Sequence, residues 1–93
     1  MSGSTLTSAG LDVRRRKILF RAWHRGTREM DLIMGRFADR EIGSLSEEEF
    51  GLFERLLEVP EPELFGWIMG SALPPPDIDE SFLARLRAFR GRT

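Results

Sequence analysis

The sequence predicts a small all-α protein, a five-helix bundle in a single domain. Three observations predict it. Apolar residues recur at helical spacing in five segments, glycines and prolines separate these segments, and no stretch alternates apolar and polar residues as a strand would. With 93 residues, the chain has the length of one domain and can bury one hydrophobic core. We expect short connections between the helices.

The bundle is expected to occupy residues 12–90, between two short tails. Residues 1–11 include several Ser, Thr and Gly and are expected to be disordered, and residues 91–93 form the C-terminal tail. No apolar run approaches the roughly 18 residues of a membrane span, so no membrane insertion is expected. The expected helices span about residues 12–25, 27–41, 46–58, 61–70 and 78–90.

The first two helices are each expected to bury one apolar stripe. The stripes consist of Ile18, Leu19, Ala22 and Trp23 in the first helix, and of Met30, Ile33, Met34 and Phe37 in the second. Gly26 is placed to end the first helix, because glycine adopts left-handed backbone angles without a Cβ penalty. Glu29 falls in the first turn of the second helix, where the helix dipole favours negative charge.

The start of the third helix carries the strongest local signal in the chain. Ser46 can accept a hydrogen bond from the backbone of Glu49, whose side chain can reach back to the backbone of Ser46. Leu45 and Phe50 can form the hydrophobic staple that accompanies such a capping box. This arrangement explains the acidic run at residues 47–49 better than a cation site does.

Prolines mark the boundaries of the last two helices. Residues 60–62 end the third helix and start the fourth, which Gly70 can close. Residues 74–76 are all proline and form a stiff spacer that cannot continue a helix. Asp77 or Asp79 can then cap the fifth helix. The expected buried residues of these two helices are Leu64, Trp67 and Ile68, followed by Ile78, Phe82, Leu86 and Phe89.

The chain lacks the residue sets that catalysis or metal binding needs, so we do not expect an enzyme. There is no cysteine, and the single histidine, His24, has no second ligand or nucleophile at a useful spacing. Four aromatic residues could stack on a flavin or on bases, but their helical spacing favours packing in the core. They are Phe50, Phe53, Phe65 and Trp67.

Charge is unevenly distributed in this chain of net charge −1, with basic residues in the first third and acidic residues in the middle. The basic run at residues 14–17 is interpreted first as a solvated face and second as a protein-docking face. A nucleic-acid-binding or antitoxin-like regulatory module that uses this basic helix is the alternative function. A nucleic-acid partner would normally require a more basic domain, so none is expected.

The segment Arg25–Glu29 is the best candidate for a binding site. It lies between two helices and places Arg25, Arg28 and Glu29 around Gly26. Such a corner can be a simple helix end, and it can also present an accessible backbone and charged side chains to a partner.

An ordered set of motifs resembles a known family. The segment RGTRE fits the motif RGxxE. It lies within the longer segment ILFRAWHRGTREMDLIMGRF, which is followed by LSEEEFGLFERLLEVPEPELFGWIMG. This order, which covers residues 14–70, is similar to that of the succinate dehydrogenase assembly factor 2 family, also called the SdhE or flavinator family. The family combines a basic first helix, the RGxxE motif and an acidic-Pro-acidic-Leu-Phe-x-Trp segment.

The resemblance implies a five-helix bundle that binds the flavoprotein subunit of succinate dehydrogenase and promotes covalent attachment of FAD to it. The flavoprotein of fumarate reductase is a further client implied by the family. In the implied mechanism, a histidine of the client attacks the 8α-methyl carbon of the flavin, and the assembly factor supplies no nucleophile. We therefore expect no stably bound cofactor, a monomer, and a location in the bacterial cytoplasm rather than the mitochondrial matrix.

The resemblance also implies which residues bind the partner. Arg25, Gly26 and Glu29 occupy the motif positions, with Gly26 admitting the backbone of the client and the two charged residues offering hydrogen bonds. The expected rim residues are Trp23, His24, Arg28 and Asp31. Glu61 and Glu63 stand where the family often has aspartates, a change expected to affect helix capping more than docking.

Overall fold

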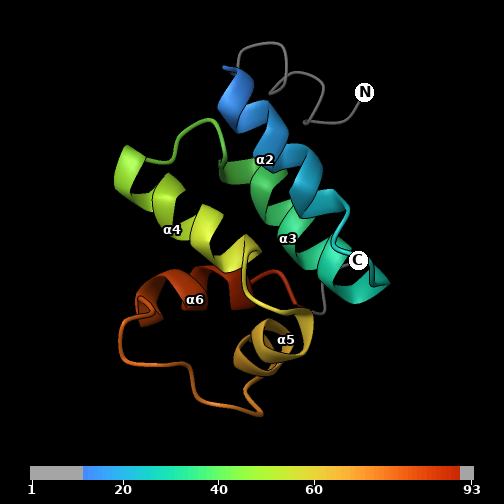
Figure 1. The fold of residues 1–93 in the computed structure, drawn as a ribbon, viewed down its shortest axis with the longest axis vertical. Helices are drawn as coiled ribbons and strands as arrows, with labels where there is room; N and C mark the ends of the chain where they lie inside the picture. Colours follow the sequence, from blue (N-terminus) through green and yellow to red (C-terminus); the bar gives the residue numbers. More distant parts are fainter. Residues whose placement is uncertain (1–11, 91–93) are drawn as a thin grey trace.

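The computed structural model describes residues 12–90, so the two predicted tails lie outside the described range. Within residues 12–90 the chain forms five helices and no strand, which confirms the predicted all-α fold (Figure 1). None of the helices in this range is long and apolar enough to cross a membrane. The helices are α2 (Val13–Trp23), α3 (Arg28–Glu41), α4 (Glu47–Leu57), α5 (Glu61–Met69) and α6 (Glu80–Arg87).

The expected first and last helices were too long. Helix α2 ends at Trp23 rather than at residue 25, because the backbone leaves helical angles at the C-cap His24. Helix α6 covers Glu80–Arg87 rather than residues 78–90, since Asp79 serves as its N-cap and its last turn tightens after Arg87. The amides of Phe89 and Arg90 bond to carbonyls three residues earlier, which is the pattern of a 3₁₀ turn.

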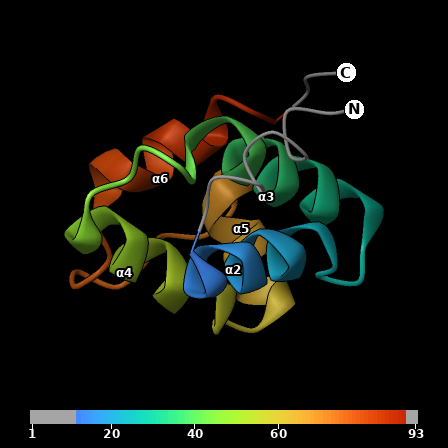
Figure 2. The same ribbon diagram turned by 90° about the horizontal axis from the view of Figure 1, so that it is seen from above.

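The helices are arranged as two packed pairs joined by α4. Helices α2 and α3 form an antiparallel hairpin, whose turn lies at the lower right of Figure 1, and α5 packs against α6. Helix α6 also contacts α3, and α4 contacts α2, so the apolar faces meet in one core (Figure 2). As a result, the α2–α3 corner and the α4–α5 connection lie close together although they are far apart in sequence.

The core is built from the apolar faces that helical spacing predicted. Met30 and Met34 are fully buried, and Phe37 contacts three other rings. Its ring centroid lies 5.2 Å from that of Phe53 and 5.5 Å from that of Phe82, in tilted and edge-on arrangements that aromatic pairs prefer. Arrangements of this kind fix the relative positions of α3, α4 and α6.

Phe65 is an exception to the prediction that the aromatic residues pack in the core. It is 37% exposed, whereas Phe50 and Phe53 are fully buried and Trp67 is 7% exposed. The reason is its position on α5. The buried side of that helix is formed by Leu64, Trp67 and Ile68, and a residue one step beyond Leu64 is rotated by about 100° away from that side.

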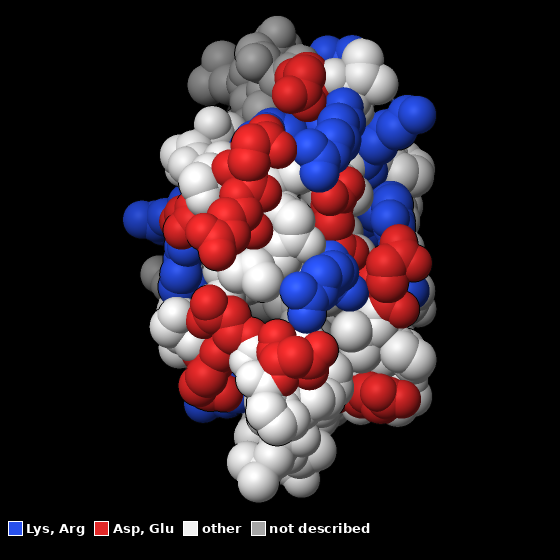
Figure 3. All heavy atoms as spheres, turned by 60° about the vertical axis from the view of Figure 1, so that its left-hand side comes forward, with Lys and Arg blue, Asp and Glu red and all other residues white. Residues whose placement is uncertain are grey.

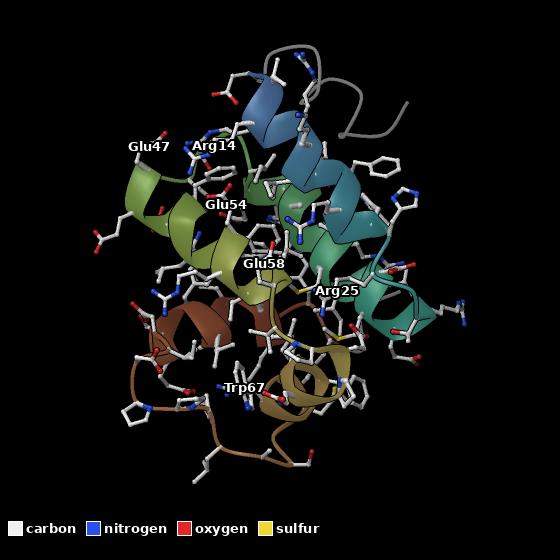
Figure 4. All side chains as sticks on the ribbon, viewed as in Figure 1. Arg14, Arg25, Glu47, Glu54, Glu58 and Trp67 are labelled. Carbon is white, nitrogen blue, oxygen red and sulfur yellow. The ribbon has the colours of Figure 1, made fainter. Side chains whose placement is uncertain are left out.

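Two basic residues of α2, Arg14 and Arg15, bind α4, which corrects the interpretation of the basic run as a solvated face for these two, while Arg16 and Lys17 are exposed. Arg14 donates to Glu54 at 2.7 Å and to Glu47 at 3.0 Å (Figure 4). The Arg14 and Arg15 guanidinium carbons also lie 4.5 and 4.7 Å from the centre of the Phe50 ring. Figure 3 shows acidic and basic side chains interleaved on the face that carries α4. The basic residues of the first third of the chain and the acidic residues of its middle therefore attract each other between α2 and α4.

Arginines at the end of α6 and in the turn that follows it bind the end of α5. Arg87 donates to the carbonyl of Trp67 from two nitrogens, at 3.2 and 3.1 Å, and Arg90 donates to the carbonyl of Ile68 at 2.7 Å. Carbonyls in the last turn of a helix have no partner within the helix. These arginines satisfy two of them and hold α5 in place.

The capping box at the start of α4 is confirmed and makes stability depend on pH. Ser46 donates its backbone N–H to Glu49 at 2.9 Å, and Arg85 donates to the other oxygen of that carboxylate at 3.0 Å. The bond from Ser46 is the main cause that lowers the pKa of Glu49 from its ordinary value of 4.5, and Arg85 lowers it further. Because the pKa is lower in the folded state, this contribution to stability is present above the unfolded value and is lost as the pH falls through the folded value.

We expect Glu49→Gln to weaken the loss of thermal stability in acid. The measurement is the midpoint of thermal unfolding between about pH 3 and about pH 7, compared with the wild type. Glu48→Gln is the matched control, since Glu48 is exposed and makes no hydrogen bond or ion pair within residues 12–90. An acid profile equally steep in Glu49→Gln and in the wild type would contradict the prediction.

Candidate partner-binding site

The α2–α3 corner, residues 24–27, presents an exposed glycine in a backbone conformation that favours glycine. Gly26 has φ +117°, a value that L-residues rarely adopt. A Cβ atom built at this position would meet no other atom within 4 Å. Gly26 follows the C-cap His24 by two residues, so it shapes the turn rather than ending α2 as expected. Within the free chain, glycine is favoured at position 26 by its backbone angle and not by a lack of space for a side chain.

Asp31 holds the backbone of this corner. Its Oδ1 accepts the N–H of Arg25 at 2.6 Å and the N–H of Gly26 at 3.1 Å. Thr27 caps α3, and its hydroxyl oxygen accepts the N–H of Met30 at 3.4 Å. The rim position expected for Asp31 is therefore also an anchoring position, because one carboxylate fixes two consecutive amides before the helix begins.

Arg25 turns into the protein and connects the corner to the α4–α5 connection. Its side chain is only 9% exposed. The guanidinium donates to the carbonyl of Leu57 at 2.5 Å, to the carbonyl of Val59 at 2.9 Å and to Glu61 at 3.0 Å. All three nitrogens are thus used within the chain, and Figure 4 shows the side chain directed at the connection below α4.

Glu61 completes this connection in a role that the sequence did not indicate. Its second oxygen accepts the hydroxyl of Thr27 at 2.7 Å, while the first accepts Arg25. One carboxylate at the start of α5 therefore binds both ends of the Arg25–Thr27 turn. The signal available in the sequence is that Glu61 stands where the family often has an aspartate, which predicts an effect on helix capping.

Trp23 is positioned by a glycine on the next helix. A Cβ on Gly35 would lie only 2.2 to 2.6 Å from atoms of the Trp23 indole, so the ring packs directly on the backbone of α3. The indole Nε1 donates to Asp39 at 3.2 Å. Trp23 is half-buried as a consequence and forms a fixed wall beside the corner.

His24 and Phe20 form an exposed aromatic pair next to the corner. Their ring centroids are 3.9 Å apart at an angle of 18°, and His24 Nδ1 lies 2.6 Å from the carbonyl oxygen of Phe20. Within residues 12–90, no group of three or more His, Cys, Asp or Glu residues is placed to hold a metal ion. Sequence reasoning missed Phe20, although an aromatic residue outside the apolar stripe of α2 was a usable signal.

The remaining predicted site residues point to solvent. Arg28 and Glu29 are exposed, and the side chain of neither makes a hydrogen bond or ion pair with another residue in the described range 12–90. The corner is hollowed into an open, shallow depression. Its lining residues are Trp23, His24, Gly26, Thr27, Arg28, Asp31 and Leu32. The structure thus brings six of the seven predicted residues into or beside one open surface, and it directs the seventh, Arg25, inward.

This arrangement offers recognition groups rather than reacting groups. An exposed glycine at position 26, two unpaired charges of opposite sign and an aromatic wall are typical of a protein-docking surface. Contacts within the chain hold these groups in place: Arg25 and Asp31 fix the corner, and Gly35 receives the ring of Trp23.

Comparison with known proteins decides the family. Residues 16–90 match the family model described as "Flavinator of succinate dehydrogenase". This chain belongs to that family. It is 41% identical over 76 residues to the FAD assembly factor SdhE of Acetobacter pasteurianus, and 35% identical over 69 residues to the mitochondrial succinate dehydrogenase assembly factor 2 of Dictyostelium discoideum. These alignments cover 82% and 74% of this chain.

The matches extend over different shares of the relatives. The alignments cover 69% of the Acetobacter protein and 49% of the Dictyostelium protein. The chain is also 43% identical over 58 residues to the FAD assembly factor SdhE of Shewanella oneidensis, across 61% of this chain and 71% of that protein. No solved structure matches the chain.

Proposed function

We propose that this chain binds the flavoprotein subunit of succinate dehydrogenase and promotes covalent attachment of FAD to it. Family membership supports a role in succinate dehydrogenase assembly. The observation that carries the proposal is the exposed Gly26 corner, in which the unpaired side chains of Arg28 and Glu29 stand beside a glycine whose N–H is held by Asp31. The motif residues Gly26 and Glu29 contact the client in this proposal, and His24, Trp23, Arg28 and Asp31 surround that contact.

Arg25 acts in this proposal by positioning the corner. A loop that is already fixed loses less conformational entropy on binding than a mobile one, which favours affinity. The bonds of Arg25 to Leu57, Val59 and Glu61, together with those of Asp31, supply that rigidity. The motif arginine therefore contributes to partner binding through the geometry that it imposes on Gly26.

The flavin remains with the client in this proposal, and the assembly factor is not an enzyme. The corner depression is open to solvent and does not enclose a ligand. A cavity between α4 and the start of α6 has a volume of about 10 Å³, about the space of one water molecule. Neither of these two hollows encloses enough space for a flavin, which supports a factor that arranges the client around its own flavin.

The nucleic-acid alternative is not favoured. The family descriptions name flavin attachment and succinate dehydrogenase assembly. In addition, Arg14, Arg21 and Arg25 of the basic segment bind acidic residues of the chain itself. Fewer cations are then left to neutralise phosphates, which is the main source of non-specific affinity for nucleic acids.

We also propose that the chain is a monomer and that it acts in the bacterial cytoplasm. The fumarate reductase flavoprotein is a second client in this proposal. The bacterial location is supported by the higher identity to the Acetobacter protein than to the Dictyostelium protein, 41% against 35%. Light scattering during size-exclusion chromatography tests the monomer.

The deciding experiment measures covalent flavin on the client. A succinate dehydrogenase flavoprotein subunit is produced with and without this chain, in a host that lacks its own flavin-attachment factor, and flavin fluorescence is read in a denaturing gel. We expect a fluorescent client band that depends on this chain. Equal fluorescence with and without the chain would overturn the proposal. The same assay with a fumarate reductase flavoprotein subunit tests the second client.

A further inference from the structure

The solvent side of α2 carries large apolar residues that the core does not use. Phe20 is 64% exposed and Val13 is 56% exposed. Together with basic residues they line a shallow surface groove, which we call the α2 outer face and define as Val13, Arg16, Lys17, Phe20 and Arg21. Helix α2 lies along the upper right side of the bundle in Figure 1.

The placement of these residues is not a by-product of core packing. Val13, Lys17 and Phe20 are spaced by four and three residues and so share one side of the helix. The core side of α2 is formed by Ile18, Leu19 and Ala22. An amphipathic surface helix normally carries polar residues on its outer side, so two large apolar residues that line one groove there indicate a contact surface.

The α2 outer face is continuous with the proposed client-binding corner. The Phe20 ring stacks on His24 with 3.9 Å between centroids. Phe20 lines the groove of the outer face, and His24 lines the depression at the corner. The two surfaces therefore meet at this aromatic pair, and a protein that covers Gly26 over a standard interface area would also reach Phe20.

The charges around Phe20 indicate the kind of surface that fits. Lys17 is exposed and makes no ion pair within residues 12–90, and Arg21, which is 44% exposed, binds Glu58 at 2.8 Å and the carbonyl of Leu57 at 3.5 Å. An apolar centre with a basic border matches the usual anatomy of protein interfaces, in which aromatic residues are buried centrally and charges lie at the rim. Duplex DNA would instead require a row of free cations that neutralises successive phosphates.

We propose that the α2 outer face is a second part of the docking surface, which receives an apolar patch bordered by acidic side chains on the client flavoprotein. Phe20 is the central contact, and Lys17 supplies the complementary charge at the rim. This inference rests on the proposed function, because the occupant is the same client that covers the Gly26 corner.

The test measures binding of the purified client subunit to full-length variants by titration calorimetry. Phe20→Ala is expected to raise the Kd at least about tenfold, as truncation of a buried interface aromatic does. Lys17→Glu is expected to raise the Kd and to reduce its dependence on salt. The matched control is Phe65→Ala, which removes an exposed aromatic residue from α5, and its Kd should stay within about twofold of the wild type.

The outcomes separate this inference from the proposed function. If the wild type does not bind the client, both fail together. If the wild type binds and neither Phe20→Ala nor Lys17→Glu changes the Kd, the outer face is not part of the interface, while the proposed function stands. Binding of duplex DNA or anionic vesicles that Lys17→Glu abolishes, without any effect on the client, would also overturn the inference. Thermal unfolding of each variant verifies that the bundle is folded.

Discussion

Replacing Gly26 with arginine is expected to reduce covalent flavin on the client at least about tenfold while the bundle stays folded. In the free protein a Cβ at this position meets nothing within 4 Å, so the new side chain starts in open space at the exposed corner. Against the client, the same side chain would occupy the space that the backbone of the partner needs. The measurement is client flavin fluorescence in a denaturing gel, together with thermal unfolding of the variant.

Two further variants separate loss of docking from backbone strain. A non-glycine residue at φ +117° costs about 1–2 kcal/mol, and Gly26→Ala carries that cost with the smallest possible side chain. Gly70→Ala imposes a comparable cost at the far end of α5, where φ is +86° and a Cβ is again unobstructed. We expect all three variants to lose similar stability. Flavin attachment should be normal in Gly70→Ala, reduced in Gly26→Ala and lowest in Gly26→Arg.

Flavin attachment that falls equally in Gly70→Ala and Gly26→Arg would show that stability alone matters. The corner would then lose its special role. Normal attachment with Gly26→Arg would remove Gly26 from the interface.

Replacing Arg25 with alanine is expected to lower the free energy of unfolding by about 2–4 kcal/mol. The change leaves the carbonyl of Val59 and one oxygen of Glu61 without their donor, and it leaves the carbonyl of Leu57 with only the 3.5 Å bond from Arg21. The magnitude is set below that of a fully buried pair because the Glu61 side chain is 25% exposed. Thermal and urea unfolding measure it, and for a domain of this size the melting temperature should fall by roughly 10 °C or more.

Arginine at position 25 should not be replaceable by lysine. Three separate nitrogens reach three acceptors in different directions, which a single ammonium group cannot reproduce. Arg21→Lys is the matched control, because Arg21 also leaves α2 to reach the end of α4 but is 44% exposed. Arg21→Lys should lower the free energy of unfolding by less than about 1 kcal/mol. Equal, small losses in Arg25→Lys and Arg21→Lys would contradict the positioning role of Arg25.

The sequence predicted the helices well because the signals for them are local. Apolar spacing of three and four residues identified the buried faces of α3 and α4, and the Ser46–Glu49 capping box fixed the start of α4. Gly70 closes α5 with φ +86°, as its position indicated. The ends of α2 and α6 were less accurate, since the last turn of a helix depends on what the following residues contact.

The sequence predicted where the candidate site lies, but not the contacts that hold its residues in place. Gly26 and Glu29 could be assigned because the motif places them at an exposed corner. The bonds of Arg25 to the α4–α5 connection join positions more than thirty residues apart, and nothing in the local sequence specifies such a partner. The packing of Trp23 on Gly35 and the exposure of Phe65 were hidden for the same reason.

The sequence by itself determined the five helices, most of their caps, the glycine at the corner and the family, because each of these is written in neighbouring residues or in an ordered motif. The tertiary structure decided what the charges do. It converted the basic first helix and the acidic third helix of the bundle into partners, turned Arg25 inward, and left Gly26, Arg28 and Glu29 facing solvent. The physical reason is that an arginine side chain can reach any acceptor brought within its length, and only the packing of helices distant in sequence determines which acceptors those are.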